Sequence, residues 1–248
     1  METNQIKRLL VVSENPGLCK YLLSVMEELG LTKSWRVDIK YTVYNDNPAA
    51  MISLGASEIN MKCDDTVMDI VNTYHMVFSV HCKQIFSEGL VNKIPCFNFH
   101  PGFNPFNRGW YPQVFSILNG LPAGATVHKM DGDIDHGDIV DQIVIDVYPD
   151  DTSLTVYDRV IEAEKILIRR NIVRILSGTC EFIEPHSEGN YNGINDFREL
   201  CKLDLSNTAS LKEHIDLLRA LSHPPYKNAY FHADGEKYFV NLVIDKES

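Results

Sequence analysis

The chain lacks an excess of basic residues and has no apolar run long enough to cross a membrane. Its 248 residues include 23 Lys and Arg against 34 Asp and Glu, a formal net charge of −11 at pH 7. Such an anionic surface repels a phosphate backbone, so we expect no nucleic acid partner. Charges or glycines interrupt every apolar run, and residues 1–8 contain no signal-peptide stretch. We therefore expect a cytoplasmic protein with no membrane partner.

Sequence signatures of three other protein classes are also missing. The six cysteines form no Cys-x-x-Cys pair, and no two histidines have the i, i+4 spacing of a zincin helix, so we expect neither a metal nor disulfides. Residues 13–17 read Ser-Glu-Asn-Pro-Gly rather than Gly-x-Gly-x-x-Gly, which argues against a dinucleotide-dependent oxidoreductase. Cys82 as a nucleophile would need a base, and on a strand the adjacent His81 points to the opposite face.

Hydrophobic residues make up 44% of the chain, and segments with a strand pattern alternate with segments with a helix pattern. Apolar runs over residues 9–12, 76–80 and 94–99 predict buried parallel strands, and the alternation over 37–43 predicts a half-exposed strand. Between the strands, apolar residues recur at helical spacing over residues 18–29. This alternation predicts an α/β, Rossmann-like domain with a mostly parallel sheet.

The pattern changes after Gly178, which ends a long helix that Thr152 or Ser153 can cap. We therefore expect a catalytic domain over residues 1–178 and a small C-terminal region over 179–248, with a helix over 211–221. In that region Asp-Gly between two aromatic strands predicts a β-hairpin. A two-stranded hairpin is not stable alone in water, so it must pack on the main domain or on a second subunit, and we expect a homodimer.

The motif that carries chemistry is Phe-Asn-Phe-His-Pro-Gly at residues 97–102, followed by Asp135 in a later loop. On a strand Asn98 and His100 share one face, and Pro-Gly ends the strand at its carboxyl end, where ligands bind in open α/β sheets. The amide can donate to the oxyanion of a tetrahedral intermediate, the imidazole can take a proton from an attacking amine, and the carboxylate can orient the imidazole. The motif predicts acyl transfer to an amine without a covalent enzyme intermediate.

These residues resemble the formyltransferases that use 10-formyltetrahydrofolate. The resemblance rests on residues 97–102, on Gly-Ala-Thr-Val-His-Lys-Met-Asp at 124–131 and on Ile-Asp-His-Gly-Asp-Ile at 134–139, and it spans roughly residues 9–176. By position, the family's catalytic triad falls on Asn98, His100 and Asp135.

A closer resemblance is to the branch that formylates nucleotide-linked amino sugars, through residues 80–86, 104–113 and 223–230. It implies 10-formyltetrahydrofolate as the formyl donor, with no metal, and a dTDP-linked amino-dideoxy sugar as the acceptor. The best match is dTDP-4-amino-4,6-dideoxyglucose, for bacterial O-antigen. A 3-amino acceptor, a formyltetrahydrofolate hydrolase and a non-catalytic nucleotide-sugar binder stay open as alternatives.

The same resemblance implies two sets of binding residues. For the folate they are Val80, His81, Cys82, Lys83, Met130, Asp131 and Asp133. For the sugar nucleotide they are Pro101, Gly102, Phe103, Asn104, Asn107, Arg108, Trp110 and Tyr226.

Physical chemistry is consistent with these assignments. The Arg108 and Lys83 cations suit a pyrophosphate, and Tyr226, which follows two prolines, offers an aromatic face on which thymine can stack. By spacing alone both cations are equally well explained as solvated surface charges. His128 is predicted to pack or hydrogen-bond rather than to catalyse, and the role of His136 is left open.

Overall fold

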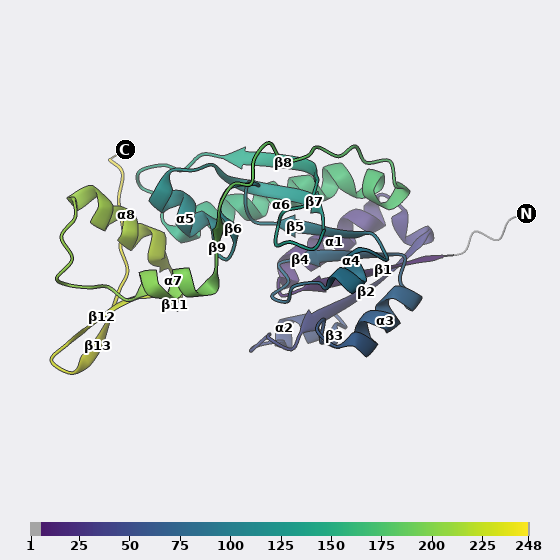
Figure 1. The fold of residues 1–248 in the computed structure, drawn as a ribbon, viewed down its shortest axis with the longest axis horizontal. Helices are drawn as coiled ribbons and strands as arrows, with labels where there is room; N and C mark the ends of the chain where they lie inside the picture. The colour runs from purple at the N-terminus through teal and green to yellow at the C-terminus, as the bar shows by residue number, and fades with distance from the viewer. Residues whose placement is uncertain (1–5, 248) are drawn as a thin grey trace, which may run out of the picture. The chain divides into compact units, whose positions relative to one another are not determined.

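The computed structural model describes residues 6–247, and its largest element is a seven-stranded sheet (Figure 1). The strand order is β3-β2-β1-β4-β5-β7-β8. The first five strands pair in parallel, and β7 pairs with β5 in antiparallel orientation. The predicted α/β, Rossmann-like fold with a mostly parallel sheet is confirmed. The strands of this sheet are β1 (Lys7–Ser13), β2 (Trp35–Thr42), β3 (Ser57–Ile59), β4 (Met76–Val80), β5 (Cys96–His100), β7 (Ala123–Lys129) and β8 (Ile139–Ile145).

Helices and short strands complete the described chain. The helices are α1 (Pro16–Glu28), the 3-10 turn η1 (Leu31–Lys33), α2 (Ala49–Ile52), α3 (Asp64–Thr73), α4 (Glu88–Val91), α5 (Pro112–Asn119), α6 (Ser153–Ser177), α7 (Ile194–Cys201) and α8 (Leu211–Leu221). The short strands are β6 (Arg108–Gly109), β9 (Tyr191–Asn192), β10 (Ser222–His223), β11 (Tyr226–Lys227), β12 (Ala229–Ala233) and β13 (Glu236–Val240). Within residues 6–247 no helix is both long and apolar enough to cross a bilayer.

Local sequence explains where these helices begin and end. The Asn15 side chain accepts a hydrogen bond from the Leu18 N–H at 3.0 Å and caps α1. Helix α8 begins with a capping box between Ser210 and Glu213. The cap of α3 is Cys63, and the carboxylates of Asp64 and Asp65 occupy its first turn, where they interact favourably with the helix dipole.

The central strands β1, β4 and β5 are buried on both faces of the sheet. One face carries Leu10, Val12, Val77 and Cys96, which cluster with the apolar residues of α3 and α4. Because β1–α1–β2 and β3–α3–β4 run in opposite directions across the sheet, the right-handed crossover rule places α1 on the other face. Helix α6 joins α1 on that face, where Arg169 Nη1 lies 2.7 Å from Glu28 Oε2.

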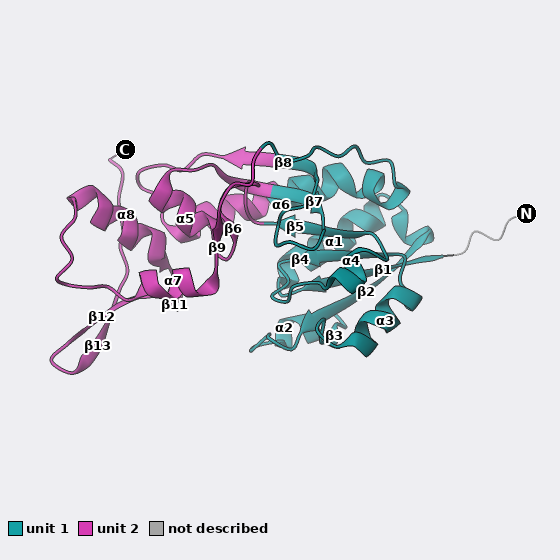
Figure 2. Ribbon diagram, viewed as in Figure 1, with its two compact units in different colours: residues 1–100, 126–142, 164–186 teal, residues 101–125, 143–163, 187–248 magenta. Residues whose placement is uncertain are grey.

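The chain forms two compact units that are interleaved in sequence (Figure 2). Unit 1 comprises residues 1–100, 126–142 and 164–186, and unit 2 comprises 101–125, 143–163 and 187–248. This division does not follow a single boundary near residue 178, because β7, β8 and α6 each contribute residues to both units. Unit 2 contains the predicted β12–β13 hairpin with its Asp-Gly turn.

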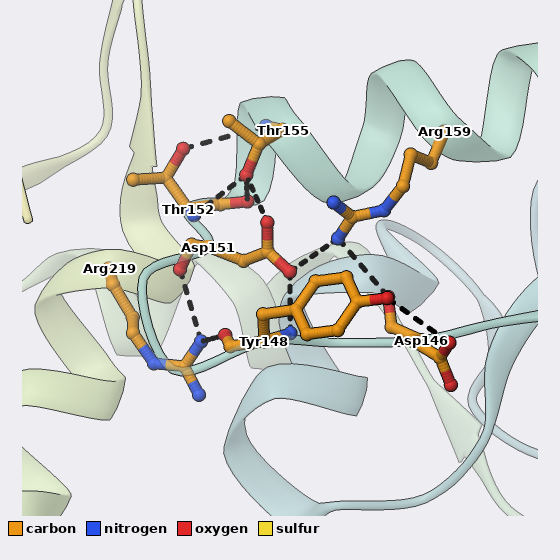
Figure 3. Close-up of polar contacts among 7 residues, drawn as sticks. All are labelled: Asp146, Tyr148, Asp151, Thr152, Thr155, Arg159 and Arg219. Carbon is orange, nitrogen blue, oxygen red and sulfur yellow. Dashed lines mark hydrogen bonds and ion pairs between the residues drawn. The ribbon is translucent and has the colours of Figure 1, made fainter. Parts of the chain in front are cut away.

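A polar cluster surrounds Asp151 in unit 2 (Figure 3). The Asp151 carboxylate accepts hydrogen bonds from the Tyr148 N–H at 2.6 Å, from the Thr155 hydroxyl at 2.9 Å and from the Arg159 guanidinium. Arg219 of α8 donates to the carbonyls of Tyr148 and Asp151, both at 3.0 Å. The cluster fixes the turn before α6 and ties it to α8.

Candidate active site

Unit 1 brings Asn98, His100 and Asp135 together at the carboxyl end of β5. The Asn98 Nδ2 donates to Asp135 Oδ1 at 2.8 Å, and Asp135 Oδ2 lies 3.4 Å from His100 Nδ1. Both strand residues are buried, with 8% of Asn98 and 3% of His100 exposed. The predicted juxtaposition of an amide, an imidazole and a carboxylate is therefore present in the structure.

Asp135 reaches this position from the loop between β7 and β8. The Asp135 backbone lies in the left-handed region, with φ of 50°, which is uncommon for a residue other than glycine. At this residue the loop therefore departs from an extended conformation. The loop is held at its start by the Met130 N–H, which donates to the Cys96 carbonyl at 2.8 Å. At its end, a Cβ on Gly137 would lie 1.9 Å from the Lys129 carbonyl oxygen, so only glycine permits this close backbone approach.

A second imidazole faces Asp135 from β7. His128 pairs in register with Asn98 across the antiparallel β5–β7 ladder. Its Nδ1 lies 3.1 Å from the Lys129 carbonyl oxygen, and its Nε2 lies 3.6 Å from Asp135 Oδ1. The backbone contact fits the prediction that His128 is hydrogen-bonded, but the sequence did not reveal its approach to Asp135. Only the register of two strands distant in sequence brings them together.

His136, whose role the sequence left open, lies within the Asp135 loop. Its Nδ1 is 2.8 Å from Asp131 Oδ2, while Asp131 Oδ1 accepts a hydrogen bond from the Asp133 N–H at 3.0 Å. The predicted folate residues Asp131 and Asp133 thus belong to one turn, which His136 braces. Their contact with a folate stays a prediction.

The other predicted folate segment begins at the last residue of β4, the neighbour of β5 in the sheet. Val80 is buried, Lys83 is exposed, and the Cys82 Sγ accepts a hydrogen bond from the Gln84 N–H at 3.4 Å. Burial raises the pKa of the Cys82 thiol to about 12, so the thiol is protonated at neutral pH. This agrees with the expectation that Cys82 is not a nucleophile.

The residues predicted to contact the sugar nucleotide lie in unit 2. Arg108 is buried and its Nη2 lies 2.6 Å from Glu188 Oε1. Tyr226 is 65% exposed, and its ring centroid lies 5.7 Å from that of His223. The exposed Tyr226 ring, packed against His223, is suited to stacking on a base. The Arg108 guanidinium, by contrast, is paired with the Glu188 carboxylate.

Asn107 lies in a buried hydrogen-bond network. It is fully buried, and its Oδ1 accepts hydrogen bonds from the side chains of Asn119 at 2.7 Å and Asn190 at 2.8 Å. Its Nδ2 donates to the Ser116 hydroxyl at 3.0 Å. These contacts organise the loop, and a contact of Asn107 with the sugar nucleotide stays a prediction. The remaining predicted residues of this set lie nearby in sequence, namely Pro101, Gly102, Phe103, Asn104 and Trp110.

Within the described residues, no group of three or more His, Cys, Asp or Glu side chains is placed to hold a metal ion.

Comparisons with known proteins identify the family of the chain. The family described as "Formyl transferase" matches residues 30–172. The family described as "N-formyltransferase dimerization C-terminal domain" matches residues 196–246.

Relatives of known name and structure are similar over most of the chain. The dTDP-4-amino-4,6-dideoxyglucose formyltransferase of Mycobacterium tuberculosis is 41% identical over 189 residues, which are 75% of this chain and 81% of that protein. A sugar N-formyltransferase from a Shewanella species is 42% identical with a TM-score of 0.95, over 98% of this chain and 100% of that chain. A 4-N formyltransferase from Francisella tularensis is 40% identical with a TM-score of 0.88, over 97% and 99% of the two chains. The chain belongs to the formyltransferase family and groups with its sugar N-formyltransferases.

Proposed function

We propose that the protein transfers a formyl group from 10-formyltetrahydrofolate to the amino group of dTDP-4-amino-4,6-dideoxyglucose, for bacterial O-antigen synthesis. The observation that carries the chemistry is the contact of one carboxylate, Asp135, with both the Asn98 amide and the His100 imidazole. The acceptor is supported by the names of two relatives that are about equally similar, one acting on this sugar and one described as a 4-N formyltransferase. The donor is supported by the family resemblance of residues 97–102 and 130–135.

In the proposed reaction the sugar amine attacks the formyl carbon of the donor. A new C–N bond forms and the carbonyl electron pair moves to oxygen, which creates an oxyanion. One N–H of the Asn98 amide donates to Asp135, and the other is the donor that we assign to the oxyanion. When the oxyanion collapses, the bond between the formyl carbon and N10 breaks and the formamide is released.

His100 moves the proton in this scheme. Its Nδ1 faces Asp135 at 3.4 Å, so Nε2 is the ring atom that exchanges a proton with the substrate. Nε2 takes the proton that the amine loses and returns it to N10 as tetrahydrofolate leaves. Asp135 stabilises the imidazolium that exists between these two transfers.

We further propose that the protein works as a cytoplasmic homodimer. Residues 196–246 match a family described as a dimerization domain. In the hairpin, Tyr238 is 45% exposed and Phe239 is 43% exposed, so an apolar surface is available for a second copy. Light scattering coupled to size-exclusion chromatography should give twice the mass of the chain, and a monomer would contradict this assignment.

The experiment that tests the function is an incubation with 10-formyltetrahydrofolate and a panel of dTDP-amino sugars, followed by mass spectrometry. We expect the 4-amino-4,6-dideoxyglucose nucleotide to gain one formyl group. Product from a 3-amino sugar alone would correct the acceptor, and formate released without any sugar would identify a hydrolase. If neither product nor formate forms, the proposed function is wrong.

A further inference from the structure

A carboxylate is buried in the apolar stripe of α6, at Glu164. The stripe that faces the sheet includes Val160, Ala163, Leu167 and Ile168, each at most 3% exposed, and Glu164 itself is 0% exposed. Burial raises the pKa of Glu164, and the neighbouring His81 opposes that rise. An apolar residue would fill the stripe without this penalty, so packing does not account for an acid here.

Glu164 holds His81 through both of its carboxylate oxygens. The His81 Nε2 lies 3.0 Å from Oε1 and 2.8 Å from Oε2, and the imidazole is 13% exposed. His81 is the first residue after β4, and its backbone is left-handed with φ of 57°. That conformation is unfavourable for a residue with a Cβ and persists where surrounding contacts enforce it. The Glu164 carboxylate is such a contact.

The segment that begins at His81 is fixed at both ends. The Glu14 N–H donates to the His81 carbonyl at 3.3 Å. Three residues later, the buried Gln84 accepts a hydrogen bond from the Met61 N–H at 2.9 Å and donates to Asn60 Oδ1 at 3.1 Å. Cys82 and Lys83 therefore lie between two residues that are held in place, His81 and Gln84. Glu164 on α6 holds the first of them.

This segment starts beside the catalytic strand. In the parallel β4–β5 ladder Ser79 pairs with Asn98 and Val80 pairs with Phe99. Val80 directly precedes His81, and its ladder partner Phe99 directly precedes His100. A shift of the segment would therefore change the edge of the proposed site without touching the triad.

We propose that Glu164 is a positioning residue for the formyl donor: through His81 it holds residues 81–84 in the conformation that receives the folate. The inference rests on the proposed function, which assigns this segment to the donor. Glu164 is fully buried, so it acts on the donor only through His81.

The test compares Glu164→Ala and Glu164→Gln with Glu162→Gln, an exposed position on the same helix. Binding of 5-formyltetrahydrofolate, an unreactive donor analogue, is measured by calorimetry, and kcat and both KM values are measured by formyl transfer. For Glu164→Ala we expect the Kd and the donor KM to rise at least about tenfold, as for the loss of a hydrogen bond to a charged group. The acceptor KM and the kcat at saturating donor should stay within about threefold. Glu164→Gln keeps one acceptor for His81 and should recover most of the donor affinity, and Glu162→Gln should match the wild type.

Wild-type donor affinity in a folded Glu164→Ala variant would overturn the inference, as would an equal loss of donor and acceptor affinity. If Glu164→Ala does not fold, His81→Ala decides: a rise confined to the donor KM supports the inference and an unchanged donor KM overturns it. Failure of the proposed function looks different, because the wild type itself would then give no formylated sugar.

Discussion

Two aspartates, the half-buried Asp135 of unit 1 and the buried Asp151 of unit 2, show how the partners of a carboxylate decide what it can do. Asp151 in unit 2 is contacted by a guanidinium, a backbone N–H and a hydroxyl. Asp135 in unit 1 contacts an amide and faces two imidazoles, at 3.4 Å and 3.6 Å. The partners of Asp151 keep their protons at neutral pH, whereas imidazoles gain and lose them there. Asp151 therefore suits a structural role and Asp135 suits proton transfer.

The largest expected difference between the two clusters is in catalysis, and it is tested by removing His100 from the Asp135 cluster and the carboxylate from the Asp151 cluster. His100→Ala should lower kcat/KM about a thousandfold, since general acid–base catalysis typically contributes 10²- to 10⁴-fold. Asp151→Ala should leave kcat/KM per folded molecule within about threefold. Steady-state kinetics with matched concentrations of folded protein checks both. Comparable losses in the two variants would erase the distinction drawn between the aspartates.

Asn98→Ala removes the amide donor but leaves His100 and Asp135 in place. We expect kcat to fall about a hundredfold or more, because loss of one oxyanion donor typically has this effect. Binding of the dTDP-sugar, measured by calorimetry, should stay within about twofold, since the amide acts on the donor's oxyanion. Turnover close to that of the wild type would exclude Asn98 from the proposed chemistry.

Asp151→Ala should affect stability where His100→Ala affects rate. It removes the side-chain acceptor of the Tyr148 N–H and of Thr155, and it leaves the Arg159 guanidinium with the Asp146 carbonyl but without its carboxylate partner. We expect this loss to lower the free energy of unfolding by about 2 kcal/mol, roughly thirtyfold in the equilibrium constant. Chemical denaturation measures this change. The exposed neighbour Asp146 is the control, and Asp146→Ala should stay within about 0.5 kcal/mol of the wild type. If the two variants unfold alike, Asp151 does not organise the turn.

The smallest effect is a pH dependence of that stability. Burial alone would raise the pKa of Asp151, but the hydrogen bonds from Arg159, Tyr148 and Thr155 outweigh it and lower the pKa. A lowered folded-state pKa means that the contribution is complete above the unfolded value of about 3.9 and is lost as the pH falls through the folded value. The stability difference between wild type and Asp151→Asn should therefore shrink as the pH falls below about 4. A difference that is constant down to pH 2 would contradict this sign.

Much of the fold was predictable because local pattern and local structure agree. The buried strands β1, β4 and β5 are continuous apolar runs, and the Asp-Gly turn marks the β12–β13 hairpin. Short elements were not predictable: β3 has three residues, and β6 and β9 have two each and form only by pairing with one another. A segment of that length carries no periodicity of its own.

The site was predictable to the extent that its residues share a strand or a recognised motif. Asn98 and His100 are two residues apart on β5, so their common face follows from the alternation of side chains. The contacts of His128 with Asp135 and of Glu164 with His81 could not be predicted from the sequence. Each residue meets its partner through tertiary packing, His128 across the β5–β7 ladder and Glu164 through a helix placed on the sheet. A single sequence does not specify which distant residues such packing brings together.

The interleaving of the two units constrains how the protein is made. Unit 1 needs residues 164–186 to be complete, while unit 2 takes its first segment from residues 101–125. Neither unit can therefore finish folding on the ribosome before most of the chain has been synthesised, in contrast to proteins whose N-terminal domain folds as an independent block. For the same reason, a chain that ends at any single position between residues 101 and 186 would lack parts of both units.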